Sequence, residues 1–216
     1  MLSVKATAMV ALLCTLAAVS IGATLKSRGA VLGMPAARTA PAAQAQPAAA
    51  VTPVPPKPLV SREPEADELR DLASRRLLMP VQGYDALKLR DNFDELRGGI
   101  RRHEALDIMA ARGTPVVAVD DGQVAKLFRS VAGGTTIYQS DASGKIVYYY
   151  AHLDRYAEGL AEGLSIKRGQ VIGYVGSTGN APANAPHLHF TIFVLGPDKK
   201  WWKGKAVNPY PYLAAR

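Results

Sequence analysis

The sequence predicts a mainly β domain built from antiparallel strands. From Val81 onward, short runs rich in β-branched and aromatic residues alternate with glycine-rich turns, and few segments show helical periodicity. The strand-like runs cover residues 114–119, 123–128, 135–139, 145–150, 169–176 and 187–195. Many short strands with tight turns are typical of an antiparallel architecture. We therefore expect the hydrophobic core to be built from about position 80 onward.

The N-terminal segment has the pattern of an export sequence. Residues 6–25 are uncharged and follow a lysine, as in a signal peptide or an uncleaved membrane anchor. About 20 residues just span a bilayer, which favours an anchor, whereas Ala18, Val19 and Ser20 offer a small-residue cleavage site. We assign residues 1–28 to a signal anchor or signal peptide, and both predict export.

Two further segments precede the predicted β domain. Residues 29–64 are rich in alanine and proline without helical or strand periodicity, so we expect a disordered, semi-extended linker. Residues 65–80 contain a predicted short helix, from Glu65 to Leu78, which Pro80 ends. Its apolar face, which includes Leu72, is expected to pack on the domain at 81–216.

Within the domain, one pair of strands carries a hairpin signal. Asp121-Gly122 separates the strand-like runs 114–119 and 123–128. An Asp-Gly pair between two apolar runs is typical of a tight β-turn. The sequence therefore predicts that these two runs pair as a hairpin.

Composition narrows the chemistry that the chain can perform. A single cysteine, Cys14, excludes both a disulfide framework and cysteine-ligated zinc, leaving histidine and carboxylate side chains as metal ligands. The net charge is +8, but the basic residues are dispersed and no nucleic-acid motif is visible. We therefore expect no nucleic-acid partner.

All four histidines of the chain fall in three short motifs. These are His103-x-x-x-Asp107, Tyr-Ala-His152-Leu and Pro-His187-Leu-His189-Phe. Each motif alone also fits a surface pair or a hydrogen-bonded structural histidine. A catalytic zinc, however, normally takes three protein ligands and keeps one position for water, and His103 and Asp107 are spaced to face one side. Together, the motifs indicate one metal-dependent hydrolase site.

The strand-like runs predict how the remaining histidines meet. His187 and His189 are two apart, so both point to one face, and one can bind metal while the other stands beside it. The alternate residues, expected in the core, are Leu188, Phe190 and Ile192. Tyr148, Tyr150 and His152 are expected to share a face of the preceding strand, so that His152 reaches the same cleft.

In this order, the three motifs and Gly176-Ser-Thr-Gly179 resemble the lysostaphin-type, or LytM-type, zinc metallopeptidases over about residues 95–210. The resemblance implies a β-sheet groove domain known as the duplicated hybrid motif, making 81–216 a zinc metallopeptidase domain. It also implies one Zn²⁺ and peptidoglycan peptides as the partner. Carried over residue by residue, it makes the metal ligands His103, Asp107 and His189, and the catalytic pair His152 and His187.

The implied function is a zinc-dependent endopeptidase that hydrolyses peptide cross-links of peptidoglycan in the cell envelope. It would face the periplasm, tethered to the inner membrane by residues 6–25, or be secreted if they are cleaved. The chain has Ala105, Ala185 and Thr191 where the family often has glycine, glycine and glutamate, and none of these removes a ligand. Which catalytic histidine acts as the base stays open.

Two other functions use the same residues differently. A non-catalytic regulator would bind and activate a cell-wall amidase through the same fold, and missing ligands would be its sequence feature. A general protease would also digest casein-like substrates. The complete ligand set favours the peptidoglycan endopeptidase.

Overall fold

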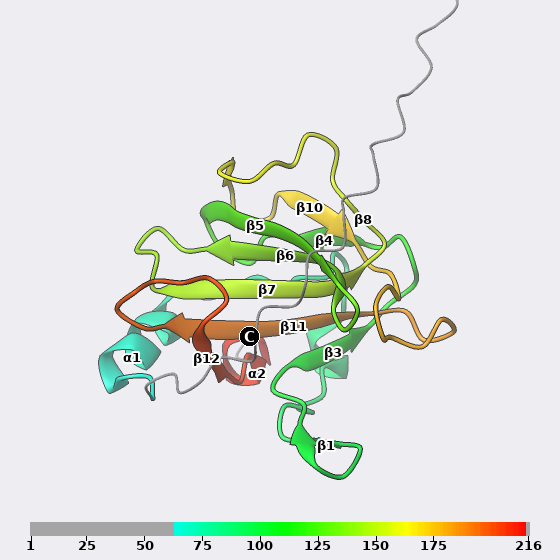
Figure 1. Ribbon diagram of the computed structural model, residues 1–216, viewed down its shortest axis with the longest axis horizontal. Coiled ribbons are helices and arrows are strands. Elements are labelled where there is room, and N and C mark those ends of the chain that lie inside the picture. The colour runs from blue at the N-terminus through cyan, green and yellow to red at the C-terminus, as the bar shows by residue number, and fades with distance from the viewer. Residues whose placement is uncertain (1–62, 215–216) are drawn as a thin grey trace, which may run out of the picture. The chain divides into compact units, whose positions relative to one another are not determined.

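The computed structural model describes residues 63–214, whose strands form three antiparallel sheets (Figure 1). The largest sheet contains β3 (Leu106–Met109), β5 (Gly122–Ser130), β6 (Gly134–Ser140), β7 (Ile146–Leu153), β9 (Ser165–Ile166), β11 (His187–Leu195) and β12 (Gly204–Val207). The smaller sheets contain β4 (Pro115–Val117), β8 (Arg155–Tyr156) and β10 (Val171–Tyr174), and β1 (Leu96–Arg97) with β2 (Arg101–Arg102). The helices are α1 (Ala66–Ser74), η1 (Ala86–Lys88) and α2 (Tyr210–Ala214). The prediction of a mainly β antiparallel domain is confirmed for these residues.

The expected N-terminal helix at 1–28 lies outside the described residues, as does nearly all of the linker at 29–64. Within residues 63–214, none of the helices combines the length and apolar character needed to cross a bilayer.

Strand β11 organises the large sheet. Residues 189–194 of β11 pair with β7, while its other edge is shared by β3 at one end and β12 at the other (Figure 1). The remaining strands follow β7 in the order β6, β5, β9. Strands β3 and β7 are far apart in sequence. The sheet places them on the two edges of β11, next to the same few residues.

The core begins earlier in the sequence than expected. Leu72 of α1 and Leu77 are both fully buried in the main core, so the expectation that the core starts near position 80 is wrong. The helix ends at Ser74 rather than Leu78, and Arg76 then adopts a φ of 48°. A residue with a left-handed backbone conformation after a helix turns the chain sharply. Here the next residue, Leu77, lies in the core.

The predicted hairpin around Asp121-Gly122 is wrong. Strand β4 pairs with β10 in the three-stranded sheet, whereas β5 pairs with β6 and β9. A Cβ at Gly122 would lie 2.2 Å from the carbonyl oxygen of Ser140. The glycine therefore permits a close approach of two backbones, and the chain passes from one sheet to another at this point.

A buried ion pair connects α1 to the large sheet. Arg75 Nη2 lies 2.9 Å from Asp141 Oδ2, and the Asp141 side chain is only 1% exposed. Asp141 also accepts bonds from the Ser143 hydroxyl and from the backbone N–H groups of Lys145 and Ile146. Burial raises the pKa of Asp141, but these bonds and Arg75 outweigh it and hold the pKa below its usual value.

Replacing Asp141 with asparagine is expected to lower the free energy of unfolding by roughly 1.5–3 kcal/mol, because a charged acceptor of several bonds is lost. The pKa of such a carboxylate is lower in the folded chain than in the unfolded chain. The carboxylate therefore stabilises the fold at pH values above its unfolded-state pKa, and this contribution is lost as the pH falls through its folded-state pKa. The difference between wild type and Asp141→Asn should therefore shrink below about pH 4. Urea titrations at neutral and acid pH measure both effects.

Asp198→Asn is the matched control, since Asp198 is 37% exposed and its two lysine partners lie at 3.6 and 3.7 Å. Its effect should stay below about 1 kcal/mol. Equal effects of the two substitutions would contradict the assigned role of Asp141.

Candidate metal centre

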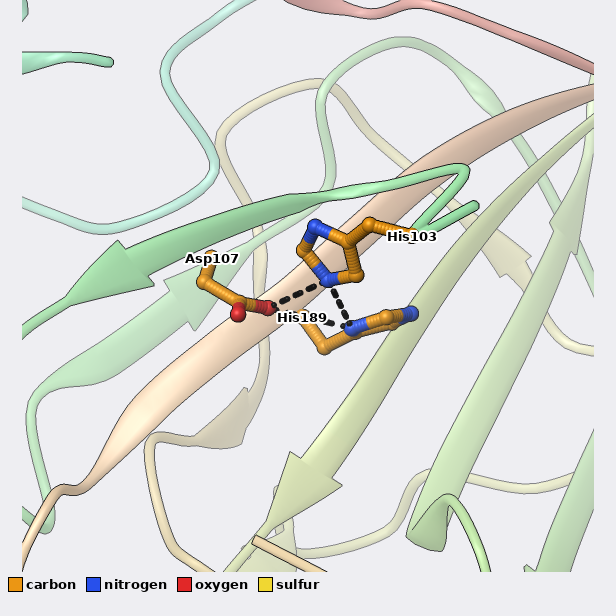
Figure 2. A group of neighbouring side chains, drawn as sticks. All are labelled: His103, Asp107 and His189. Atoms are coloured by element: carbon orange, nitrogen blue, oxygen red, sulfur yellow. Dashed lines mark hydrogen bonds and ion pairs between the residues drawn. The ribbon is translucent and has the colours of Figure 1, made fainter. Parts of the chain in front are cut away.

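Pairing of β3 with β11 forms the base of the site. The register places Asp107 directly opposite His189, and both side chains point to the same face of the sheet (Figure 2). His103 precedes β3, and Glu104, with a φ of 59°, turns the chain between them. Figure 2 shows the two imidazole rings and the carboxylate converging on one point. The structure thus brings together all three residues that the sequence indicates as metal ligands.

The three facing atoms form a nearly equilateral triangle. His103 Nε2 lies 3.0 Å from Asp107 Oδ1 and 3.1 Å from His189 Nδ1, and the third side, from His189 Nδ1 to Asp107 Oδ1, is 3.1 Å. Tetrahedral zinc with bonds of about 2.0–2.1 Å requires ligand atoms roughly 3.3 Å apart. Two imidazole nitrogens and one carboxylate oxygen at this spacing fit a zinc ion with one open position.

The orientation of His103 is set by the loop before β1. Its Nδ1 lies 3.0 Å from the carbonyl oxygen of Asn92, to which an N–H at that position donates. Nε2 is then the unprotonated nitrogen, as a metal ligand must be. The side-chain oxygen of Asn92 accepts from the backbone N–H of Asp107 at 3.2 Å. One residue therefore positions both a ligand ring and a ligand-bearing strand.

The protonation tendencies of Asp107 and His189 suit a cation. Burial raises the pKa of Asp107, but the neighbouring His103 and His189 rings outweigh it, so the pKa lies well below its usual range. Burial lowers the pKa of His189. The carboxylate is thus held ionised, and the buried His189 ring favours its neutral form, which is the protonation state needed for metal binding.

The other two histidines lie beside this triangle. His152 and His187 have ring centroids 4.9 Å apart, and the His152 centroid is 5.4 Å from that of His189. Each ring has Nδ1 at 2.8 Å from a backbone carbonyl oxygen, that of Thr178 for His152 and that of Ala185 for His187. These bonds place the N–H on Nδ1 and leave Nε2 as a proton acceptor. His187 Nε2 lies 3.6 Å from Asp107 Oδ1.

His152 is held as a neutral base. Burial lowers its pKa to about 4, with a further lowering by the neighbouring His189. A histidine with this pKa carries no charge at neutral pH, so its Nε2 lone pair is free there.

The carbonyl that orients His152 depends on two glycines. A Cβ at Gly134 would lie 2.2 Å from Thr178 Oγ1, and one at Gly179 would lie 2.3 Å from the backbone nitrogen of Gly134. Both glycines also have positive φ values. Because neither has a side chain, the loop after β10 packs directly on the loop before β6. The Thr178 carbonyl is thereby held against the His152 ring.

The sequence also matches a known family of peptidases. The model of peptidase family M23 matches residues 101–209, just over half of the chain and all five of the residues described above. The chain belongs to peptidase family M23.

Several relatives of the M23 domain have described activities. The chain is 36% identical over 123 residues to the L-Ala--D-Glu endopeptidase of Bacillus subtilis, covering 55% of this chain and 36% of that protein. It is 33% identical over 120 residues to the peptidoglycan DD-endopeptidase ShyC of Vibrio cholerae, covering 53% and 27%. The crystallised catalytic domain of lysostaphin from Staphylococcus simulans is 33% identical, with a TM-score of 0.45 and coverage of 55% and 82%. The chain thus spans only between about a quarter and about a third of the length of these two curated relatives.

The side chains that share a face with His152 differ from those that the sequence predicts. Tyr150 packs on Phe190 in the core, whereas Tyr149 lies edge-on to His189 with ring centroids 6.2 Å apart. His152 therefore reaches the side of Tyr149, and the prediction that it shares a face with Tyr148 and Tyr150 is wrong. Its φ of 59° interrupts the alternation of the strand.

Two residues of the site were absent from the sequence interpretation. Asn92 acts partly through its backbone carbonyl, which any residue type supplies, so its identity carried no signal for that contact. Arg97 contacts Asp107 from the hairpin of β1 and β2. Gly98-Gly99, both with positive φ, is a hairpin signal that the sequence did contain.

Proposed function

We propose that this chain is a zinc endopeptidase that hydrolyses peptide cross-links of peptidoglycan in the cell envelope. The observation that carries the proposal is the triangle of ligand atoms with 3.0–3.1 Å sides, next to two histidines held with Nδ1 against carbonyl oxygens. Membership of family M23 and the activities named for its relatives support the substrate class.

His103, Asp107 and His189 would hold the zinc ion. Three protein ligands and an open fourth position are typical of catalytic rather than structural zinc sites. When bound, the ion would supply Lewis-acid polarisation of the scissile carbonyl and of a water molecule. The carboxylate contributes the one negative charge among the three ligands.

His152 and His187 would handle the protons of the reaction. Peptide hydrolysis requires that the attacking water lose a proton and that the leaving amine gain one. A ring whose Nδ1–H is bonded to a carbonyl offers Nε2 for that transfer. One of the two would accept the proton of the water and deliver it to the leaving amine. The other would take up a proton from solvent at Nε2 and donate it in a hydrogen bond to the negative oxygen of the tetrahedral intermediate.

The envelope location is part of the proposal. The segments at 1–28 and 29–64 would export the M23 domain to the periplasm and hold it there on a tether, or release it if the first segment is cleaved. A linker of alanine and proline would let the domain reach a polymer that cannot diffuse to it.

The purified chain is expected to contain one zinc ion and to release muropeptide fragments from isolated peptidoglycan sacculi. Removal of the metal with a chelator should abolish release, and added zinc should restore it. Metal analysis and mass spectrometry of the fragments measure the two quantities and identify the bond that is cut.

Three results would contradict the proposal. One is a chain without metal, and another is release that survives complete metal removal. The third is a zinc-loaded chain that cuts no cross-link but stimulates an amidase, which would support the regulator function instead. Casein serves as the control substrate, since its digestion would indicate a general protease.

A further inference from the structure

The hairpin of β1 and β2 carries an arginine that turns back to the metal centre. The hairpin projects from the β3 end of the molecule (Figure 1), and its apolar residues Leu96 and Ile100 are 61% and 91% exposed. Arg97 has a 40% exposed side chain, but its Nε is buried. The hairpin is therefore mostly solvated, and Arg97 is one of its inward contacts.

Arg97 hydrogen-bonds the carboxylate ligand. Its Nη2 donates to Asp107 Oδ2 at 2.6 Å. The same nitrogen lies 3.0 Å from His103 Nδ1, but the N–H of that atom is directed to the Asn92 carbonyl, so this approach is a close contact and not a hydrogen bond. The Asp107 side chain is only 14% exposed. A guanidinium–carboxylate bond of this length, largely shielded from water, is a strong charge-assisted hydrogen bond.

The two oxygens of the Asp107 carboxylate have different partners. Oδ1 of Asp107 faces both His103 Nε2 and His189 Nδ1, at 3.0 and 3.1 Å, whereas Oδ2 is occupied by Arg97. A carboxylate with both oxygens free can bind a cation through one or both of them. A second oxygen on the ion would take up the position that a catalytic site keeps for water.

We propose that Arg97 is a positioning residue that binds Oδ2 of Asp107 and so restricts this ligand to one oxygen. The inference rests on the proposed zinc site. Groups that orient a metal ligand in this way typically contribute 10–100-fold to metal affinity. The hairpin thereby becomes part of the metal centre, although it supplies no ligand.

The test compares three variants of the full chain. Arg97→Met removes the donor, and Arg97→Lys keeps the charge as a single point donor. Arg102→Met is the matched control, because Arg102 lies on the same hairpin but pairs with Asp94 at 2.7 Å, and both side chains are exposed. Zinc affinity is measured by competition with a chromophoric chelator, and thermal unfolding checks that each variant is folded.

Arg97→Met is expected to bind zinc about 10–100-fold more weakly than wild type, and Arg97→Lys to recover part of the loss. Arg102→Met should stay within about twofold. Cobalt substitution provides a second readout, since the visible bands of bound cobalt depend on its ligands and their geometry. The bands of Arg97→Met should differ from those of wild type, because the second oxygen of Asp107 would replace water on the ion.

Unchanged zinc affinity in Arg97→Met, or equal weakening in Arg102→Met, would overturn the inference. If Arg97→Met does not fold, Arg97→Gln replaces it with the same thresholds. Because zinc affinity is measured without substrate, a failure of this inference can be distinguished from a failure of the proposed function. A chain that binds zinc through Arg97 but cuts no peptidoglycan refutes the proposed function alone, and an active Arg97→Met with normal zinc affinity refutes this inference alone.

Discussion

His189→Ala is expected to lose zinc binding and to lower the release of muropeptides by roughly a thousandfold or more. The substitution removes one corner of the ligand triangle and leaves two ligands, fewer than a catalytic zinc requires. Loss of several kcal/mol of transition-state stabilisation, at about 1.4 kcal/mol per factor of ten, accounts for a loss of this size. Metal analysis after dialysis and digestion of sacculi measure the two effects.

The matched control lies two residues along the same face of β11. Thr191 is 2% exposed, and within residues 63–214 its hydroxyl has no hydrogen-bond partner. Thr191→Val is nearly isosteric and removes only that unpaired hydroxyl, so zinc content and activity should be unchanged. A His189→Ala variant that retains a full zinc ion would contradict the ligand assignment.

Strand periodicity explains why the sequence predicted the His187 and His189 pair correctly. Leu188, Phe190 and Ile192 are fully buried, which fixes the face on which the two histidines lie. A slip of one residue would exchange the two faces, so a strand with one apolar side has little freedom of register. Here local pattern and tertiary structure agree.

Long-range pairing could not be obtained in the same way. The Asp121-Gly122 signal was real, but turn residues report local backbone geometry and not which strands become partners. Strand β4 instead pairs with Val171–Tyr174, more than fifty residues away. The meeting of Asp107 with His189 likewise depends on β3 and β11 sharing a register, which the resemblance to known peptidases implied and periodicity did not.

Irregular backbone accounts for the remaining differences. His152 has a φ of 59°, and the pairing register between β6 and β7 shifts beside it. An ideal alternation places Tyr150 on the side of His152, whereas the observed strand places Tyr149 there. Such bulges re-aim a single side chain and are frequent next to active sites. The irregular backbone at His152 therefore makes the sequence prediction wrong and also brings His152 to the metal centre.

His152→Ala and His187→Ala are each expected to keep zinc but to lower turnover by about 10²–10⁴-fold. Neither ring belongs to the ligand triangle, whereas both can hold a proton at Nε2, and a positioned acid or base contributes an effect of this size. Zinc analysis together with kcat and KM on a defined cross-linked muropeptide separates the two properties.

The contrast with His189→Ala is what makes this prediction specific. If the two histidines serve one proton pathway, removing both should cost little more than removing the more important one, because residues that act as a unit are not additive. A double variant whose loss equals the product of the two single losses would indicate independent roles. Zinc loss in either single variant would instead make that histidine part of the metal site, and the triangle would no longer describe the whole ligand set.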